Sequence, residues 1–550
     1  MAAKIAQEPR TEDRLGWEVW VVAALAIAVY SPTLAAPFHF DDFSLLTDPA
    51  VVLPDGPLGL LQPERTRPLA YLTFWLNYQI GGADPFGYHL LNIGLLAALA
   101  FAAASVYSRL APRPAAFAAL VFFVLHPLQS EPAAYVFGRA TALATFFALL
   151  SWRSWIDGRW PRAVAWYAAA LLAKEEAASL PVFLAGYEWV FRRADTERWS
   201  NAVRASLLML LLGVATALRL IYAAAVTPGP GAGFELEATG PAGYLLTQGR
   251  VVWLYLRLVA APWVGQTIDH DVPFVRELDV MTVVAWLAFA LLVGAALQLM
   301  RKHREFYWLV GALILLAPSS SLFPLADAAA ERRMFLPMAS LALLFGAGFA
   351  YFGGRLGVRG VTAATITLSV ALGALSWERS KVWSNEEALW REAVRQAPVK
   401  VRPRLQLARA LEAHGDGARG ERRQLLNDAL ALEPDNPTVA SEMGVFYLAG
   451  GEPERALEAF EAARSLDPGE PRIQASIATT LYMMGRVEEA EQGFRETLQR
   501  DACNFDARNN LMLILRSRSD EDSARKLARE ASPDCRFSEE QRRAFEAAAR

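Results

Sequence analysis

Long apolar runs decide the fold, and the first reads WEVWVVAALAIAVYSPTLAA over residues 17–36. A transmembrane helix needs about 20 consecutive, mainly apolar residues. Further runs follow at about 86–108, 114–127, 131–152, 163–174, 178–191, 203–226, 278–300, 306–318, 334–353 and 359–377. The sequence therefore predicts an all-α, polytopic membrane domain of about eleven spans over residues 1–377. Runs 68–80 and 243–262 contain polar or charged positions and predict interfacial or re-entrant helices.

Charged residues between the runs predict the orientation in the membrane. Lys and Arg gather in alternate connectors, at 109–113, 153–162, 192–204, 301–304 and 355–359. Cytoplasmic connectors are enriched in Lys and Arg. We therefore expect an integral membrane protein with a cytoplasmic N-terminus and an extracytoplasmic C-terminal part. The Ala- and Arg-rich composition suggests a bacterium, and hence its inner membrane. The first run is longer than a signal-peptide core, which predicts an uncleaved first span.

Composition narrows the classes of function. Of 550 residues, 54% are hydrophobic and 20% are charged, and the net charge is -3. This charge argues against a nucleic-acid partner, which requires a basic face. Two cysteines, Cys503 and Cys535, and six scattered histidines do not supply a zinc site. The sequence leaves open whether the two cysteines pair.

Beyond a charged linker at 378–402, the sequence changes to a helical repeat over 403–550. Pro437, Pro471 and Phe505 are 34 residues apart, which is the period of a tetratricopeptide repeat. Each repeat has small residues where its two helices meet and a large aromatic residue beside them, such as Ala456 and Phe460. We expect an α-solenoid that binds a protein or peptide. The copy at 403–436 differs because Arg422 stands where a small residue is expected.

Two adjacent carboxylates, Asp41 and Asp42, follow the first span in the loop Phe38 to Phe43. A carboxylate in a partly dry cleft can accept the proton of an attacking hydroxyl. A paired carboxylate can raise the pKa of its neighbour, orient it, or bind a divalent metal. The alternative is structural, because two aspartates can also hydrate a loop or cap a short helix.

Several cations occur at membrane depth on the side predicted for the two aspartates. They are Arg139, Lys174, Arg332 and Arg333. Intramembrane charges are costly and usually face a functional cavity. Arginine donates two parallel hydrogen bonds and therefore suits a phosphate. The alternative is internal pairing, for example of Lys174 with Glu175.

Other polar residues at the span ends are weaker candidates for lining the site. They are His89, Asn92, His126, Glu131 and Glu175. A lone histidine at a span end is more often an interfacial hydrogen-bonding group than a catalyst. Arg65 and Arg67 flank the run at 68–80 and could simply anchor it to lipid headgroups.

Several motifs, taken together, resemble one known family. The stretches run from Arg67-Pro68 to Asn77-Tyr78, Asp84 to Asn92, His126 to Glu131, Val136 to Ala140, Lys174 to Glu176 and Ala330 to Pro337. With the Asp41-Asp42 pair and the repeats, they resemble the transmembrane and tetratricopeptide repeat (TMTC) proteins. The resemblance covers nearly the whole chain in order.

The resemblance implies a GT-C glycosyltransferase fold and O-mannosyltransferase activity. The family's animal members use a lipid-phosphate mannose and modify serine or threonine in the secretory lumen. Carried over, Asp41 or Asp42 is the general base, and Arg139, Lys174 and Arg332 surround the donor phosphate. We expect a polyprenyl-phosphate sugar as donor and no required cofactor, with a divalent metal on the aspartates as a minor alternative. The sugar and the acceptor stay undetermined.

Two other classes of function are compatible with the sequence. A non-catalytic membrane scaffold would use its repeats to organise envelope proteins, and a transporter would move a lipid-linked sugar. Replacement of Asp41 and Asp42 by asparagine distinguishes a transferase from a scaffold and a transporter, because only a transferase should lose product while still binding its donor.

Overall fold

The computed structural model describes residues 15–53, 56–60, 62, 65–226, 240–320, 324–355, 357–531, 535, 537 and 539–549. These residues form helices and no β-strand, which confirms the predicted all-α class. The chain divides into two compact units. Unit 1 comprises residues 1–45 and 50–389, and unit 2 comprises residues 46–49 and 390–550.

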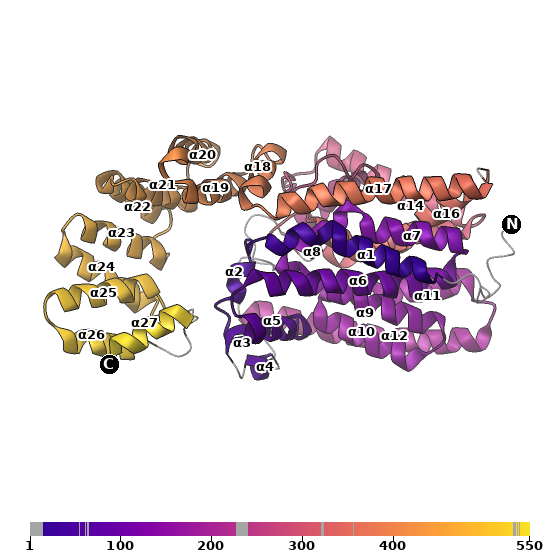
Figure 1. Ribbon diagram of the computed structural model, residues 1–550, viewed down its shortest axis with the longest axis horizontal. Helices are drawn as coiled ribbons and strands as arrows, with labels where there is room; N and C mark the ends of the chain where they lie inside the picture. The colour runs from indigo at the N-terminus through magenta and orange to yellow at the C-terminus, as the bar shows by residue number, and fades with distance from the viewer. Residues whose placement is uncertain are drawn as a thin grey trace. The chain divides into compact units, whose positions relative to one another are not determined.

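Unit 1 is a bundle of long helices joined by short helical turns (Figure 1). Its α-helices are α1 (Trp17–Tyr30), α2 (Asp42–Leu45), α4 (Gly56–Gly59), α5 (Pro68–Gly81), α6 (Pro85–Leu110), α7 (Arg113–Leu125), α8 (Ser130–Ala134), α9 (Arg139–Ile156), α10 (Trp160–Ala173), α11 (Leu180–Phe191), α12 (Thr196–Val226), α13 (Pro241–Ala260), α14 (Val280–Met300), α15 (Tyr307–Leu316), α16 (Phe335–Gly353) and α17 (Gly357–Trp383). Short 3-10 turns include η4 (Pro127–Gln129), η5 (Val136–Gly138), η6 (Glu175–Ser179) and η9 (Glu331–Met334). Helices α3 (Pro49–Val52) and α18 (Glu386–Gln396) lie at the boundaries between the units.

All the predicted apolar runs are helical, although the run at 131–152 is divided into α8, η5 and α9, and the predicted count of spans is not confirmed. Among the described residues, six helices are long and apolar enough to cross a membrane, or seven if one bent pair is a single span. Helices α7, α10, α11 and α15 have only 13, 14, 12 and 10 residues. Proline and charge interrupt the runs, at His126-Pro127 after α7 and at Lys174-Glu175-Glu176 between α10 and α11.

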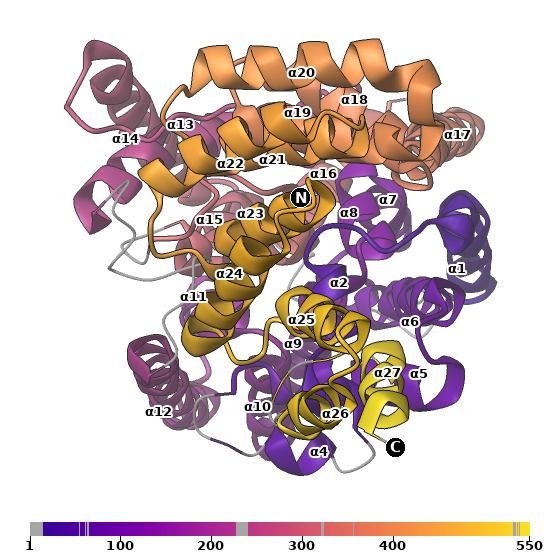
Figure 2. The ribbon, with the colours of Figure 1, turned by 90° about the vertical axis from the view of Figure 1, so that its left-hand side faces the viewer.

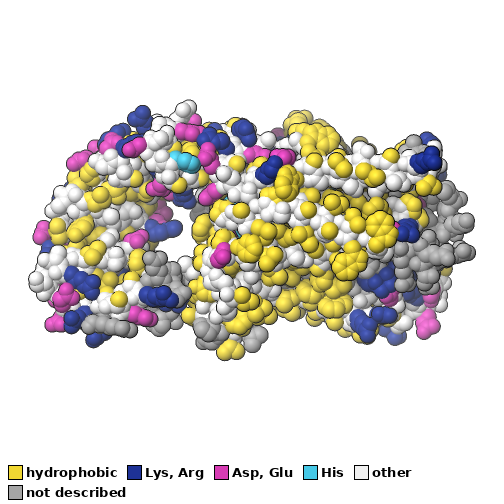
Figure 3. All heavy atoms as spheres, viewed as in Figure 1, with side chains coloured by type: hydrophobic (Ala, Val, Ile, Leu, Met, Phe, Trp, Pro, Cys, Tyr) yellow, Lys and Arg dark blue, Asp and Glu magenta, His cyan; other side chains and the backbone are white. Residues whose placement is uncertain are grey.

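The outer helices of unit 1 expose apolar side chains. Only 11% of the most apolar windows of α12 and α14 is buried. Figure 3 shows a broad hydrophobic face over the long helices, with charged side chains gathered near the helix ends. A surface this apolar is typical of contact with lipid, and with the long spans it indicates a membrane protein.

Inside the bundle, small residues allow close helix packing. A Cβ atom on Gly346 of α16 would lie 2.3 Å from the carbonyl oxygen of Ala115 on α7. Glycine is therefore required for this approach, because any side chain would collide with backbone. Small residues at such contacts are the usual means of packing helices in membranes.

Three of the basic connectors meet at one end of unit 1. Arg109 and Arg153 both contact Asp157, at 2.7 and 3.0 Å, which joins the connectors that follow α6 and α9. Arg198 contacts Glu188 at 2.7 Å and donates to the Trp155 carbonyl of α9 at 3.0 Å, which adds the connector that follows α11. Glu131 lies near the other end of α9, and Asp42 contacts the turn before the same helix.

Unit 2 is a series of antiparallel helix pairs (Figure 2). Its helices are α19 (Val401–Ala410), α20 (Arg419–Leu432), α21 (Pro437–Ala449), α22 (Pro453–Leu466), α23 (Pro471–Met483), α24 (Val487–Arg500), α25 (Phe505–Ser517), α26 (Glu521–Arg529) and α27 (Glu539–Ala549). The first helices of three pairs begin at Pro437, Pro471 and Phe505, as the period predicts. Ala456 and Phe460 are fully buried, and the Phe460 ring fills the space over Gly444.

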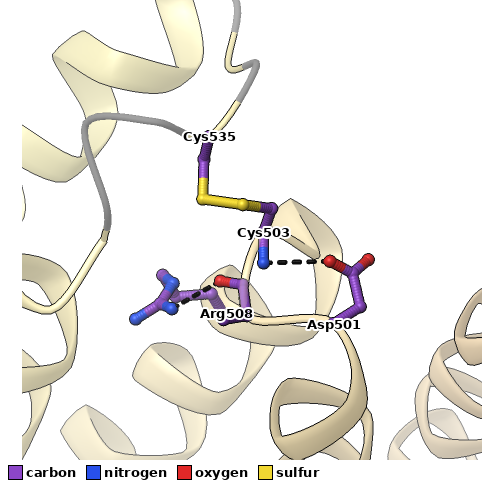
Figure 4. Close-up of a disulfide and its surroundings, with 5 residues drawn as sticks. Asp501, Cys503, Arg508 and Cys535 are labelled. Atoms are coloured by element: carbon purple, nitrogen blue, oxygen red, sulfur yellow. Dashed lines mark hydrogen bonds between the residues drawn. A yellow bond between two sulfur atoms is a disulfide. The ribbon is translucent and has the colours of Figure 1, made fainter. Parts of the chain in front are cut away.

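Two features of unit 2 resolve points that the sequence left open. Cys503 and Cys535 form a disulfide, and the nearby Asp501 side chain accepts a hydrogen bond from the Cys503 backbone N–H (Figure 4). Arg422 replaces a small residue without disrupting the repeat, because its guanidinium lies 5.7 Å from the centre of the Phe446 ring.

Candidate active site

Asp41 and Asp42 differ sharply in their surroundings. The Asp42 side chain is fully buried and accepts hydrogen bonds from the backbone N–H groups of His39 (3.0 Å), Val136 (3.3 Å) and Phe137 (2.8 Å). Asp41 is exposed. Asp42 therefore fastens the loop from Phe38 to Phe43 to the turn before α9, and Asp41 is the accessible carboxylate of the pair.

Burial shifts the pKa values of this loop. It raises the pKa of Asp42 from 3.8 to about 7, although the three backbone hydrogen bonds act in the opposite direction. It lowers the pKa of His39 to about 4, so the imidazole is neutral near pH 7. The His39 Nε2 lies 2.8 Å from the carbonyl oxygen of Trp383 and ties the loop to α17.

The loop meets a sharp break in a membrane helix. The segments Pro127–Ala134 and Val136–Ile156 are bent by 106° relative to each other, with Tyr135 between them. A break frees backbone carbonyls that need partners at this depth. The Asn92 side-chain amide lies 3.3 Å from the carbonyl oxygen of Tyr135 and 3.4 Å from that of Pro132. Broken helices of this kind form binding sites in many membrane proteins.

Arg139 does not have the surroundings predicted for a phosphate ligand. Its side chain is 1% exposed and lies against the Phe74 ring, 4.7 Å from the centre. It donates to the side-chain oxygens of Asn92 and Asn77, both at 2.7 Å, and to the Tyr88 carbonyl at 2.9 Å. The guanidinium joins α5, α6 and α9, and protein acceptors occupy the N–H groups that would hold a phosphate.

Arg332 lies beside the break and close to the acid pair. Its Nη1 donates to Glu131 at 2.5 Å, and its backbone N–H donates to the same carboxylate at 2.7 Å. The guanidinium is 5.9 Å from the centre of the Tyr135 ring, and the next two residues, Val136 and Phe137, donate their backbone N–H groups to Asp42. The Arg332 side chain is 26% exposed, and its other N–H groups donate no hydrogen bond to the described parts of the chain.

Lys174 and Arg67 complete a group of three cations, each paired with a carboxylate. Lys174 donates to the Thr141 hydroxyl at 2.7 Å and contacts Glu176 at 2.6 Å. Arg67 makes two hydrogen bonds to Glu175. Lys174 interacts electrostatically with both Arg67 and Arg332, so the three cations form one region.

Arg67 was not predicted as a phosphate ligand. Its backbone φ of 55° is unusual for a residue with a side chain, and it lies at the start of α5. The signal for it was present, because Arg67-Pro68 opens one of the motifs that carries the family resemblance. Without the fold, nothing indicated that Arg67 lies next to Lys174.

The remaining predicted residues support the loops around the site. Arg333 is buried and donates to the Tyr244 hydroxyl (3.2 Å) and the Ala328 carbonyl (2.9 Å). His126 is buried, with Nε2 3.1 Å from the Val259 carbonyl. His89 is buried beneath Ala36 and Pro37 at the base of the acidic loop.

No metal-binding cluster is apparent in the part of the chain that the structure describes. Within those residues, no group of three or more His, Cys, Asp or Glu side chains could hold a metal ion.

The fold and the sequence comparisons define the class of protein. It is an α-helical membrane protein with a C-terminal repeat unit, and the tetratricopeptide repeat model matches residues 417–479 and 447–508. The chain contains tetratricopeptide repeats, as predicted.

The relatives of the chain confirm the predicted resemblance. It is 24% identical over 437 residues to Protein O-mannosyl-transferase F38B6.6 of Caenorhabditis elegans, which covers 72% of this chain and 60% of the relative. It is 24% identical to mouse Protein O-mannosyl-transferase TMTC4, over 73% of this chain and 64% of the relative. Human Protein O-mannosyl-transferase TMTC2 is 35% identical, over 24% of this chain and 18% of the relative. The names of these relatives support a glycosyltransferase role.

The matches cover only part of each relative. The chain spans about 60% of the length of the first two relatives. Among solved structures, MamA matches with a TM-score of 0.24 and 15% identity, over 29% of this chain and 89% of MamA. A TM-score this low does not establish a common fold.

Proposed function

We propose that this protein is an integral membrane glycosyltransferase. It moves mannose or another hexose from a polyprenyl-phosphate carrier to a hydroxyl of a protein or glycan, on the outer side of a bacterial inner membrane. The observation that supports this most strongly is that the Asp41-Asp42 pair and Arg332 both lie next to the helix break at Tyr135. Asp42, the neighbour of Asp41, accepts from the backbone N–H groups of Val136 and Phe137, and the Arg332 guanidinium lies 5.9 Å from the centre of the Tyr135 ring.

In this proposal Asp41 is the general base. It is exposed, whereas three backbone N–H groups already occupy the buried carboxylate of Asp42. A base must reach the proton that it removes, and the exposed group meets this condition. Asp42 positions the loop and does not touch the acceptor.

Arg332, Lys174 and Arg67 bind the donor phosphate. Their carboxylate partners Glu131, Glu176 and Glu175 hold them in place before the donor arrives. The oxygens of a phosphate would accept hydrogen bonds from the Arg332 N–H groups that donate to no described residue. Cations preset around the leaving group stabilise the charge that develops on it in the transition state.

The reaction is a single inverting displacement. The acceptor oxygen attacks the anomeric carbon from the face opposite the phosphate, and Asp41 takes the hydroxyl proton. The bond between the anomeric carbon and the phosphate oxygen breaks, and its electron pair leaves on the polyprenyl phosphate. The leaving group is a monophosphate, so cationic side chains can neutralise it and no metal is required.

The disulfide supports the proposed sidedness of unit 2. Cys503 and Cys535 are paired, and disulfides persist in oxidising compartments such as the bacterial periplasm. The basic connectors that meet at one end of unit 1 would then be cytoplasmic.

The test is transfer by the purified full-length protein in liposomes. The donor is polyprenyl-phosphate mannose with a radiolabelled sugar, and the acceptor is a pool of envelope proteins analysed by mass spectrometry. We expect Asp41→Asn to lower product formation at least about a hundredfold, within the range for a general base, while donor binding persists. Glu277→Gln, which changes an exposed loop carboxyl, is the matched control. Unchanged transfer by Asp41→Asn would rule out the proposed base.

A further inference from the structure

A second candidate binding site lies in unit 2, in a hollow between α20, α21 and α22. The hollow has a volume of 170 Å³. Its lining includes Arg419, Arg423, Phe446, Tyr447, Glu452 and Arg455. Nothing in the transferase proposal uses these residues.

The charges of this hollow do not balance. The lining contains three arginines and only one carboxylate, Glu452. Glu452 contacts Arg419 and Arg455 at 2.5 Å each. Arg423 is exposed and makes no hydrogen bond or ion pair with any described residue. A hollow with surplus positive charge attracts an anionic group, and the free guanidinium of Arg423 can bind that group directly.

Aromatic rings hold two of these arginines in fixed orientations. The Arg455 guanidinium lies 4.0 Å from the centre of the Tyr447 ring and donates to the Tyr447 hydroxyl at 2.8 Å. Arg419 lies 5.5 Å from the centre of the Phe446 ring. These contacts and the shared Glu452 carboxylate hold both guanidiniums in place, which reduces the entropy lost on binding.

A glycine keeps the space that Arg419 occupies. A Cβ atom on Gly450 would lie 1.9 Å from the Arg419 Nη2. The Gly450 φ of -85° is accessible to any residue, so glycine is not required for the backbone conformation. Its function is to leave room for the guanidinium beside the hollow.

We propose that this hollow binds the carboxylate of an acidic side chain in an extended peptide. The planar fork of the Arg423 guanidinium matches a planar carboxylate, and the positive charge of Arg419 and Arg455 beside it adds to the attraction. Tetratricopeptide repeats present long surfaces suited to extended segments, so the carboxylate would serve as one anchor of a longer contact. This inference does not depend on the transferase reaction.

The test measures peptide binding to the full-length protein in detergent by fluorescence anisotropy. The probe is a fluorescein-labelled peptide of alternating glycine and glutamate, with a glutamine version as its uncharged counterpart. We expect the glutamate peptide to bind and Arg423→Gln to weaken it about tenfold. A tenfold loss corresponds to about 1.4 kcal/mol, near the lower limit for a charge-assisted hydrogen bond.

The control is Arg525→Gln on α26, because Arg525 is also exposed and has no hydrogen bond or ion pair among the described residues. It should bind the peptide as the unmodified protein does. Equal weakening by both substitutions would overturn the site, since it would indicate general attraction to a basic surface. Equal binding of the glutamine peptide would overturn it as well. Displacement of the peptide probe by inorganic phosphate alone would identify a phosphate site and would overturn the peptide assignment.

Discussion

The Asp42 side chain accepts a hydrogen bond from the backbone N–H of Phe137 at 2.8 Å, across 95 positions of sequence. This contact joins the loop from Phe38 to Phe43 to the helix break before α9. It fixes the position of Asp41 relative to Tyr135, and it separates the roles of two adjacent aspartates that the sequence could not distinguish.

The first prediction concerns stability. Asp42→Asn should lower the free energy of unfolding by about 1–3 kcal/mol, because one amide oxygen cannot accept all three N–H bonds. Asp41→Asn should change it by less than about 0.5 kcal/mol, as expected for an exposed residue. Thermal unfolding of both variants in detergent measures the difference. Equal stability of the two variants would contradict the structural role of Asp42.

The second prediction is a dependence of stability on pH. The Asp42 pKa of about 7 lies above its usual value of 3.8, so the folded state holds a proton that the unfolded state has lost. This contribution to stability is complete below about pH 4 and is lost as the pH rises through 7. The slope should approach about 1.4 kcal/mol per pH unit within that window.

Thermal unfolding of the unmodified protein and of Asp42→Asn, between pH 5 and 8, measures this slope. The slope should be smaller in Asp42→Asn, because asparagine does not titrate. Parallel curves for the two proteins would show that other groups cause the pH dependence.

The helices and repeats were predictable because they depend on local patterns. Apolar runs such as 17–36 fix where helices form, and the 34-residue period fixes the starts of α21, α23 and α25. The number of spans was not predictable in the same way. The apolar runs are divided into short helices at His126-Pro127 and at Lys174-Glu175-Glu176. Composition alone does not determine whether two such helices span the membrane together.

The sequence indicates candidate residues for the site but not what each of them contacts. The sequence predicts that Arg139 and Arg332 are both cations at membrane depth. In the structure, Asn77, Asn92 and Tyr88 surround only Arg139. Those partners lie on α5 and α6, at 62, 47 and 51 positions from Arg139 in the sequence. The same limitation concealed Arg67, whose neighbour Glu175 is 108 positions away.

The third prediction separates these two arginines by substitution with lysine. Arg332→Lys should keep the protein folded and lower kcat/KM about tenfold to a hundredfold, because it keeps the charge but loses the fork that holds a phosphate. Arg139→Lys should instead destabilise the protein by about 1–3 kcal/mol, because it leaves buried acceptors unpaired. The measurements are initial transfer rates and thermal unfolding of each variant. A stable Arg139→Lys that loses donor binding would restore Arg139 to the phosphate site.

The fourth prediction concerns the disulfide of unit 2. Cys503 and Cys535 are separated by 32 positions, and closing a loop of this size stabilises a fold by about 3–4 kcal/mol through the lost freedom of the unfolded chain. The double variant Cys503→Ser with Cys535→Ser should therefore lower the unfolding temperature of the repeat unit. A reductant should have the same effect on the unmodified protein and none on the variant. In intact bacteria, the two cysteines should resist a thiol-reactive label until the protein is reduced. Ready labelling without reduction would place unit 2 in a reducing compartment and contradict the proposed orientation.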